Sequence, residues 1–182
     1  MYGKRVKDLM VSLDEYPLVS QDTTLREAVL VLEEAQTRLV GRRQPYRAVL
    51  VVDEKNRIVG KIGQLAFLRA LEPRCNVIGD LESLAVAGVS EEFLSSMMEH
   101  YRFFQERLSD LCARSSRVLV KDVMRPVTQS VDENATLRET IHRIVMWQTL
   151  SLLVTRDNAV VGLVRLSDLF DAVAEQLKAA AG

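Results

Sequence analysis

Apolar residues gather in short dense runs that come in two similar pairs. AVLVVD from Ala48 and SLLVT from Ser151 are dense enough to predict buried strands. A second apolar run, IVGKI or VVGLV, follows each of them after a charged turn. Two such runs around a short polar turn predict a β-hairpin in each half of the chain. The turn residues are Glu54, Lys55 and Asn56 in the first half and Arg156, Asp157 and Asn158 in the second.

Helical patterns lie on both sides of each hairpin. TLRE at 24–27 and again at 136–139 has the form of a capping box, in which the threonine caps the helix and the glutamate reaches back. A closing helix is predicted over about Leu65–Leu71 and about Asp168–Leu177. Each half therefore follows the order strand–helix–strand–strand–helix. The apolar residues expected on the buried faces of the two capped helices are Leu25, Ala28, Val29, Leu32 and Leu39, and Leu137, Ile141, Ile144 and Val145.

The two halves are diverged copies of one unit. VKDLM at 6–10 recurs as VKDVM at 120–124, TLRE is repeated without change, and VVDEKNRIVG is answered by LVTRDNAVVG. One copy is too small to bury both faces of its sheet, so the two copies should pack across a pseudo-twofold axis. The predicted fold class is α/β (α+β), with two β-α-β-β-α repeats at 4–71 and 118–177 and a helical insertion at 72–117.

The insertion carries a separate helical pattern. Ser90 is expected to cap a helix, and apolar residues then recur at spacings of three and four over about three heptads, which is short for an independent coiled coil. This helix either packs on its own domain or forms a dimer or partner contact. The residues of the pattern are Leu94, Met97, Tyr101, Phe104, Leu108 and Leu111.

Charge and composition exclude several classes of function. The 182 residues hold 24 basic and 25 acidic side chains, without the basic surplus of most nucleic-acid-binding proteins. No apolar run reaches the roughly 18 residues of a membrane span. Cys75 and Cys112 are expected to be semi-buried free thiols, which favours a reducing, cytoplasmic location. His100 and His142 lack catalytic partners at a suggestive spacing, and no metal-binding or phosphate-binding motif is present, so catalysis is not expected.

These features together resemble a tandem pair of cystathionine-β-synthase (CBS) domains, also called a Bateman module. KDVMRPVTQSVDENATLRETI is an especially close match to the opening of a CBS domain. The resemblance covers about Lys4–Leu71 and Val118–Leu177 and leaves the insertion uncovered. It implies a homodimer that requires no cofactor, binds AMP, ADP, ATP or S-adenosylmethionine between the copies, and regulates an unknown protein target.

The family's binding pattern, G-h-h-[ST]-x-x-D, is altered in both copies. Asp168 keeps the acidic position in the second copy, but Arg165 replaces the serine or threonine. In the first copy Gly63 and Ala66 replace both polar residues. A carboxylate accepts hydrogen bonds from both hydroxyls of a ribose diol, and a helix N-terminus favours its charge. At most one good nucleoside site is therefore expected.

Family geometry implies which side chains accompany Asp168 and Arg165. Pro17, Leu18, Tyr46 and Arg47 are expected opposite Asp168, with Thr149 and Ser167 nearby and Arg165 and Arg47 as donors to a phosphate.

Simpler interpretations of the same residues stay open. Asp168 would then only cap its helix, Arg165 would pair on the surface, and Tyr46 would be an aromatic at the core edge. An arginine group formed by Arg38, Arg42, Arg43 and Arg47 would be a solvated loop. The leading function is a sensor of adenosine ligands that controls a partner by a conformational or dimer-packing change. The alternative is a ligand-independent dimerisation or adaptor scaffold.

Overall fold

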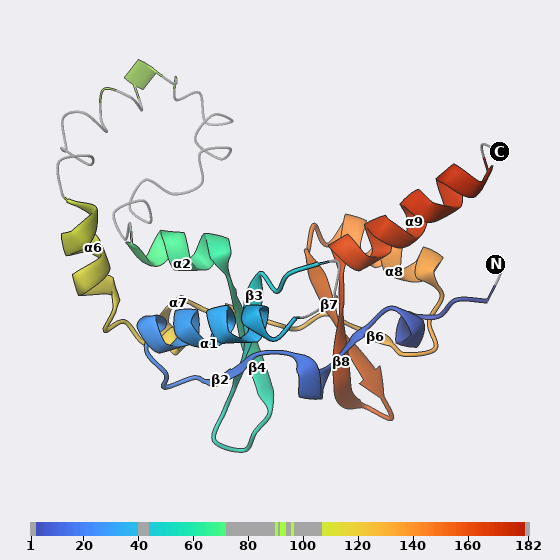
Figure 1. Ribbon diagram of the computed structural model, residues 1–182, viewed down its shortest axis with the longest axis horizontal. Helices are drawn as coiled ribbons and strands as arrows, with labels where there is room; N and C mark the ends of the chain where they lie inside the picture. The colour runs from blue at the N-terminus through green and yellow to red at the C-terminus, as the bar shows by residue number, and fades with distance from the viewer. Residues whose placement is uncertain are drawn as a thin grey trace.

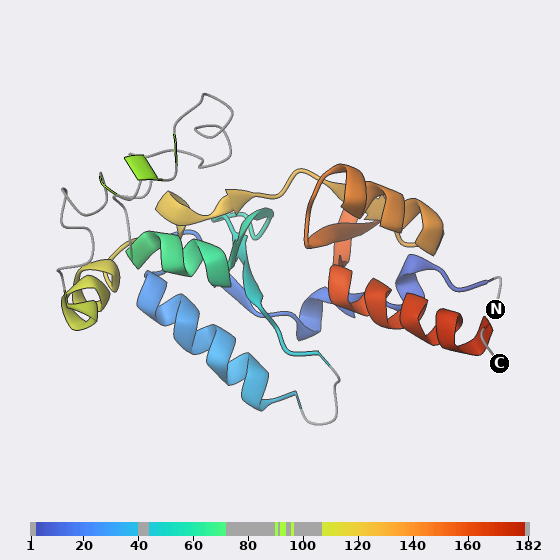
Figure 2. The ribbon, with the colours of Figure 1, turned by 90° about the horizontal axis from the view of Figure 1, so that it is seen from above.

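The computed structural model describes residues 3–39, 44–71, 90, 92–93, 96 and 107–180. Two four-stranded sheets lie side by side, with one pair of helices outside each (Figures 1 and 2). The predicted β-α-β-β-α order is confirmed in both halves. The first repeat contains β2 (Leu18–Ser20), α1 (Leu25–Thr37), β3 (Ala48–Val52), β4 (Ile58–Gly63) and α2 (Gln64–Leu71). The second contains β6 (Ser130–Asp132), α8 (Leu137–Met146), β7 (Ser151–Arg156), β8 (Ala159–Arg165) and α9 (Leu166–Ala180).

Each sheet is completed by a short strand that precedes the other repeat. β1 (Val11–Ser12) pairs antiparallel with β8, and β5 (Arg125–Pro126) pairs antiparallel with β4. The strand orders are therefore β1-β8-β7-β6 and β2-β3-β4-β5. The sequence did not lead us to expect this exchange, and the domain boundaries 4–71, 72–117 and 118–177 stay a prediction. Short helical turns flank the exchanged strands: η1 (Val6–Asp8), η2 (Leu13–Glu15) and α7 (Val120–Val123).

The repeated VKD motif makes the same contacts in both directions. In each copy, two consecutive backbone N–H groups of the motif donate to the turn before the capped helix of the opposite repeat. These hydrogen bonds run from Val6 to Ala135 (3.1 Å) and Lys7 to Glu133 (2.9 Å), and from Val120 to Thr23 (2.9 Å) and Lys121 to Gln21 (3.0 Å).

The first valine of each motif is buried in the hydrophobic core of the opposite repeat. Val6 is completely buried among Val131, Leu152 and other apolar residues of the second repeat. Val120 is equally buried in the larger cluster formed by the first sheet. Burial of apolar surface is the main favourable contribution to folding, so the hydrophobic effect fixes the exchanged segments in place.

Helix caps and turns follow the predictions with small differences. Thr24 and Glu27 form the complete capping box. Thr136 accepts a hydrogen bond from the N–H of Glu139 (3.2 Å), but the Glu139 carboxylate bonds Arg143 instead of closing the box. Val29 and Val145, predicted on buried helix faces, are exposed because each follows the buried residue before it by one position, about 100° around the helix. Positive φ angles at Asn56, Asp157 and Asn158 confirm the predicted hairpin turns.

Part of the insertion is described by α6 (Leu108–Ser115), which lies beside α2 (Figure 1). The Ser115 hydroxyl donates to the Ala70 carbonyl (3.0 Å), and Leu111 is buried whereas Leu108 is exposed. The Ser90 hydroxyl accepts a hydrogen bond from the Phe93 N–H, as a cap would. Leu94, Met97, Tyr101 and Phe104 of the predicted pattern, together with Arg42, Arg43, Cys75 and His100, lie outside the described residues.

Two further predictions concern the exposure of Cys112 and the presence of a membrane span. Cys112 is an exposed free thiol, so its predicted partial burial is wrong: α6 turns this position towards solvent. Among the helices of the described segments, none combines the length and apolar character that crossing a membrane requires.

Candidate functional site

Asp168 stands in the first turn of α9. The helix begins at Leu166, directly after β8, so Asp168 lies inside the helix and the interpretation of Asp168 as its N-cap is wrong. The N-terminal end of a helix carries partial positive charge, which favours a carboxylate there. The side chain is 14% exposed and hence mostly shielded from water.

Arg165 holds the Asp168 carboxylate in a two-pronged ion pair. Its Nε donates to Oδ2 and its Nη2 to Oδ1, both at 2.6 Å. The Arg165 side chain is only 11% exposed, so the expectation of a surface pair is wrong. Burial lowers the pKa of Arg165, but its hydrogen bonds and charge attraction to Asp168 raise that pKa overall. Both carboxylate oxygens are therefore engaged by the arginine that replaces the serine or threonine.

The same arginine reaches the first repeat. Its Nη1 donates to the carbonyl oxygens of Gln44 (3.3 Å) and Pro45 (3.4 Å), in the segment before β3. Its guanidinium carbon lies 5.8 Å from the centroid of the Tyr46 ring, within cation–π range. We name Arg165, Asp168, Gln44, Pro45 and Tyr46 the inter-repeat clasp.

Tyr16 packs against Tyr46 of the clasp. Its ring meets that of Tyr46 edge-on, with 5.0 Å between centroids, and the Tyr46 hydroxyl donates to the Glu15 carbonyl (2.6 Å). Burial raises the pKa of Tyr16 to about 12, although Arg165 opposes this rise, so Tyr16 is neutral at physiological pH. Tyr46 is 3% exposed and belongs to the core. The clasp therefore rests on a rigid aromatic pair.

A cavity of about 310 Å³ opens beside the Arg165–Asp168 ion pair, at the lower end of the size range of small-molecule sites. The N-terminal segment, including Met10, forms one wall, and α9, including Asp168 and Ala172, forms the other. Four acidic and two basic side chains line it: Asp8, Asp168, Asp171 and Glu175, with Lys4 and Arg165. This cavity thus carries an excess of negative charge.

The remaining predicted site residues are not members of the clasp. Pro17 is buried and its carbonyl accepts from the Leu50 N–H (3.0 Å), while Leu18 and Arg47 are exposed. Ser167 is half-buried. The Thr149 hydroxyl accepts from Lys61 Nζ of the first repeat (3.3 Å). The structure thus brings together only Asp168, Arg165 and Tyr46 of the predicted set.

A lysine of the first repeat bonds the second repeat, whereas the position equivalent to Asp168 is Ala66. Lys61 on β4 donates from Nζ to the Ser151 hydroxyl (2.9 Å) and to Thr149. Burial, with Arg125 adding to it, lowers the pKa of Lys61. Within the described ranges no three His, Cys, Asp or Glu side chains stand together as metal ligands.

The model of the family described as "CBS domain" matches residues 6–73 and 120–175. The chain belongs to the CBS-domain family. With two matched regions it is a tandem CBS pair, as the repeated motifs predicted. No curated protein sequence matches it.

Solved CBS-pair structures share this fold. CBSX2, a CBS-pair protein from Arabidopsis thaliana, is 17% identical with a TM-score of 0.59 over 97% of each chain. A structure of CBSX2 in complex with AMP is 18% identical, with a TM-score of 0.58 over 97% of this chain and 99% of that one. The CBS domain of a membrane protein from Sphaerobacter thermophilus is 19% identical, with a TM-score of 0.60 over 93% and 88%. At these identities the likeness establishes the fold of the CBS pair alone.

Sequence reasoning missed four residues that matter in this CBS pair. Gln44 and Pro45 complete the clasp. Tyr16 packs on Tyr46, and Lys61 of the first repeat bonds Ser151 of the second. Tyr16 could have been found from the sequence, because it is an aromatic residue directly before the predicted site residue Pro17. Gln44 and Lys61 gave no such signal, because polar residues beside a strand or within it are ordinarily solvated.

Proposed function

We propose that this CBS pair is a non-catalytic regulatory module that senses an adenosine-containing small molecule at Asp168. The observation that carries the proposal is the shielded Asp168 carboxylate, held at a helix N-terminus where the two repeats meet. A ribose diol has two hydroxyl donors, and the Arg165 fork has two donors on the same oxygens. Ligand and arginine compete in this proposal for the lone pairs that Arg165 now engages.

The competition suggests how binding is transmitted. If a ribose takes the lone pairs of Asp168 that Arg165 now engages, Arg165 is displaced, and its guanidinium becomes available to a phosphate, a good partner for a forked donor. Moving Arg165 also weakens its bonds to Gln44 and Pro45 in the first repeat. A ligand shifts a conformational equilibrium only by its different affinity for the two states, and the clasp makes such a difference. The open clasp would present a different surface to the regulated protein.

Calorimetric titration of the wild type with AMP, ATP and S-adenosylmethionine tests the site, with 2′-deoxy-AMP as the matched ligand. Asp168→Asn is expected to weaken AMP binding by about tenfold to a hundredfold, the loss typical of a hydrogen bond to a charged group. The wild type should prefer AMP to 2′-deoxy-AMP, and the variant should not. Asp157→Asn, in the β7–β8 turn, is the control and should bind as the wild type does. Equal binding of AMP by wild type and Asp168→Asn would refute the assignment.

The substitution Arg165→Gln distinguishes competition between Arg165 and the ligand from a purely structural role of Arg165. Without the competing guanidinium, adenosine is expected to bind several-fold more tightly, whereas AMP gains less because the phosphate loses its donor. A melting curve checks that the variant is folded. If no adenosine compound raises the melting temperature of the wild type, although binding should do so by mass action, the clasp is a structural pair and the chain a scaffold.

We also propose that the module is a homodimer. Leu166, Phe170 and Leu177 fall on one face of α9 and are 42%, 68% and 68% exposed. Val145 and Met146 on the neighbouring α8 are exposed as well. A second copy that packed its helices on this apolar face would remove the surface from water. Phe170→Glu is expected to convert the dimer to a monomer in light scattering, while Lys178→Glu on the same helix should remain dimeric. A monomeric wild type contradicts this assignment.

A further inference from the structure

Lys61 joins the two repeats through its side-chain nitrogen. The residue is half-buried on β4, and its Nζ donates to the Ser151 hydroxyl (2.9 Å), the Thr149 hydroxyl (3.3 Å) and the Ser151 carbonyl (3.5 Å) of the second repeat. All three acceptors are neutral. Within the described residues no carboxylate forms an ion pair with Lys61. A partly shielded ammonium group therefore stands between the repeats without a counter-ion.

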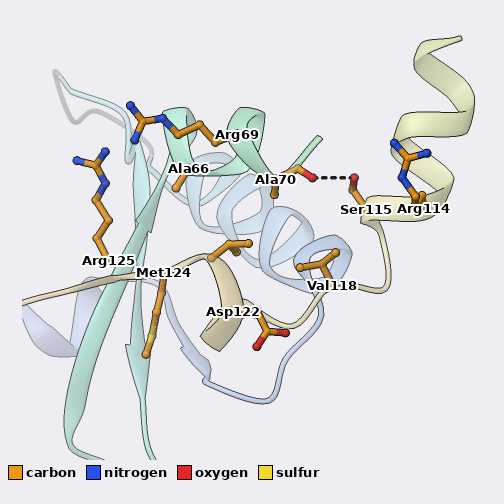
Figure 3. A pocket seen from close by; sticks show the side chains of 10 residues that line it. Ala66, Arg69, Ala70, Arg114, Ser115, Val118, Asp122, Met124 and Arg125 are labelled. Carbon is orange, nitrogen blue, oxygen red and sulfur yellow. Dashed lines mark hydrogen bonds between the residues drawn. The ribbon is translucent and has the colours of Figure 1, made fainter. Parts of the chain in front are cut away.

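A second cation lies opposite Lys61. Lys61 and Arg125 are direct partners across the antiparallel β4–β5 pair, so their side chains leave the sheet from the same face. Figure 3 shows the Arg125 side chain extending to one side of β5 while the carboxylate of Asp122, on the α7 turn just before it, points the other way. In the part of the chain that the structure describes, Arg125 has no ion pair with a carboxylate either. Like charges placed directly opposite are destabilising, so an anion at this position would stabilise the contact.

The Ser151 hydroxyl adds a hydrogen-bond donor at the same point. Ser151 is only 9% exposed, and its Oγ accepts from Lys61. A serine hydroxyl can also donate one hydrogen bond, and no acceptor for that hydrogen is found among the described residues. Thr149, in contrast, already donates to the Ser151 carbonyl (3.1 Å). An acceptor group attached to Lys61 would therefore meet a hydroxyl donor and a guanidinium group.

The Lys61 amine is activated as a nucleophile by its surroundings. Burial, with the charge of Arg125 adding to it, lowers the pKa of Lys61, which increases the share of neutral amine at a given pH. A desolvated lysine next to another cation is a usual form of activated nucleophile. Lys121 provides the contrast within the same chain, because its hydrogen bond and ion pair with Asp22 raise the pKa of Lys121 and keep it protonated.

We propose that Lys61 is a carbamylation site for carbon dioxide. The lone pair of the neutral Nζ forms a bond to the carbon of carbon dioxide, the electron pair of one C–O π bond moves onto its oxygen, and one proton leaves the nitrogen for water. The product is an anionic carbamate, and the step needs no oxidant, reductant or leaving group. The carbamate oxygens accept a hydrogen bond from the Ser151 hydroxyl and pair with the Arg125 guanidinium.

Carbamylation exchanges a cation for an anion at a contact between the repeats. The bonds that Lys61 now donates to Thr149 and Ser151 must then rearrange, and the repulsion between Lys61 and Arg125 becomes an attraction. This modification goes beyond the adenosine site at Asp168 and shares no residue with it. The CBS pair thereby gains a second input, which reports carbon dioxide.

Carbon NMR spectroscopy of the full chain, equilibrated with isotopically labelled bicarbonate at mildly alkaline pH, tests the proposal. The wild type should show a carbamate resonance in addition to that of the amino terminus, and Lys61→Arg, which keeps the positive charge, should lose only this resonance. Trapping the carbamate with a trialkyloxonium reagent, followed by peptide mass spectrometry, locates it. The trapped fraction at Lys61 should be several-fold higher than at Lys121.

Two variants test the groups around the carbamate, and a melting curve checks that each is folded. Arg125→Gln should lower the apparent equilibrium constant for carbamylation of Lys61 by about tenfold, the loss typical of a hydrogen bond to a charged group. Ser151→Ala should lower it as well. Arg138→Gln, an exposed arginine of α8, is the matched control and should react like the wild type.

Asp168→Asn should be carbamylated like the wild type, so a failure of the adenosine site can be distinguished from a failure of this one. The proposal is overturned if the wild type and Lys61→Arg give the same resonances, if Lys121 is trapped as readily as Lys61, or if Arg125→Gln reacts as fully as the wild type.

Discussion

Val6→Asp is expected to destabilise the second repeat rather than the first, although Val6 belongs to the first copy of the repeated sequence. Val6 is completely buried against Val131, Leu152 and Val154. A carboxylate there would lose its hydration without a partner, and burying an unpaired charge is among the few changes that cost more than about 4 kcal/mol. That loss is comparable with the whole stability of many domains, about 5–15 kcal/mol.

Hydrogen exchange measured by mass spectrometry checks where stability is lost. Val6→Asp should reduce protection mainly in β7 and β8, whereas the mirror change Val120→Asp should reduce it mainly in β3 and β4. Greater loss in β3 and β4 for Val6→Asp, or equal loss in both sheets for both variants, would contradict the exchange of segments between the repeats.

Gly162→Ala is expected to lower the free energy of unfolding by about 1–3 kcal/mol, the usual cost of overpacking. A Cβ at position 162 would lie 2.5 Å from the backbone oxygen of Val11 and 3.2 Å from Met10 Sδ. The backbone of β1 must then move away from β8, which weakens the pairing of the exchanged strand. Only glycine allows the two strands to approach this closely.

Two other glycines provide matched comparisons for chemical denaturation. At Gly60 a Cβ would lie 2.6 Å from Sδ of the flexible Met124 side chain and 3.0 Å from the backbone oxygen of Arg125. The nearest backbone oxygen is thus farther away than the 2.5 Å at Gly162, so Gly60→Ala should cost less than Gly162→Ala. At Gly63 nothing lies closer than the Arg47 oxygen at 3.7 Å, so Gly63→Ala should be neutral or slightly stabilising. A Gly162→Ala variant as stable as Gly63→Ala would show that β1 adapts without cost.

The candidate site was only partly predictable from the sequence. The position of Asp168 followed from a spacing pattern, and its place in the first turn of a helix is a local property. Arg165 bonds Asp168 because its side chain turns towards the residue three positions later. Gln44, Pro45 and Tyr46 contact the same guanidinium group. Those partners lie about 120 residues away in the chain. No spacing within one repeat reports such a contact, nor the bond of Thr149 to Lys61 of the first repeat.

The sequence by itself determined the repeat, the order of its strands and helices, and the loss of the acidic residue at Ala66. Periodicity, caps and turn residues act over a few neighbouring positions, and each can be seen along the chain. Only the tertiary structure decided that β1 and β5, which follow VKDLM and VKDVM, each complete the sheet of the opposite repeat, and that Arg165 closes over Asp168. These features arise where segments far apart in the chain meet, and there packing and desolvation, which no local pattern encodes, select the contacts.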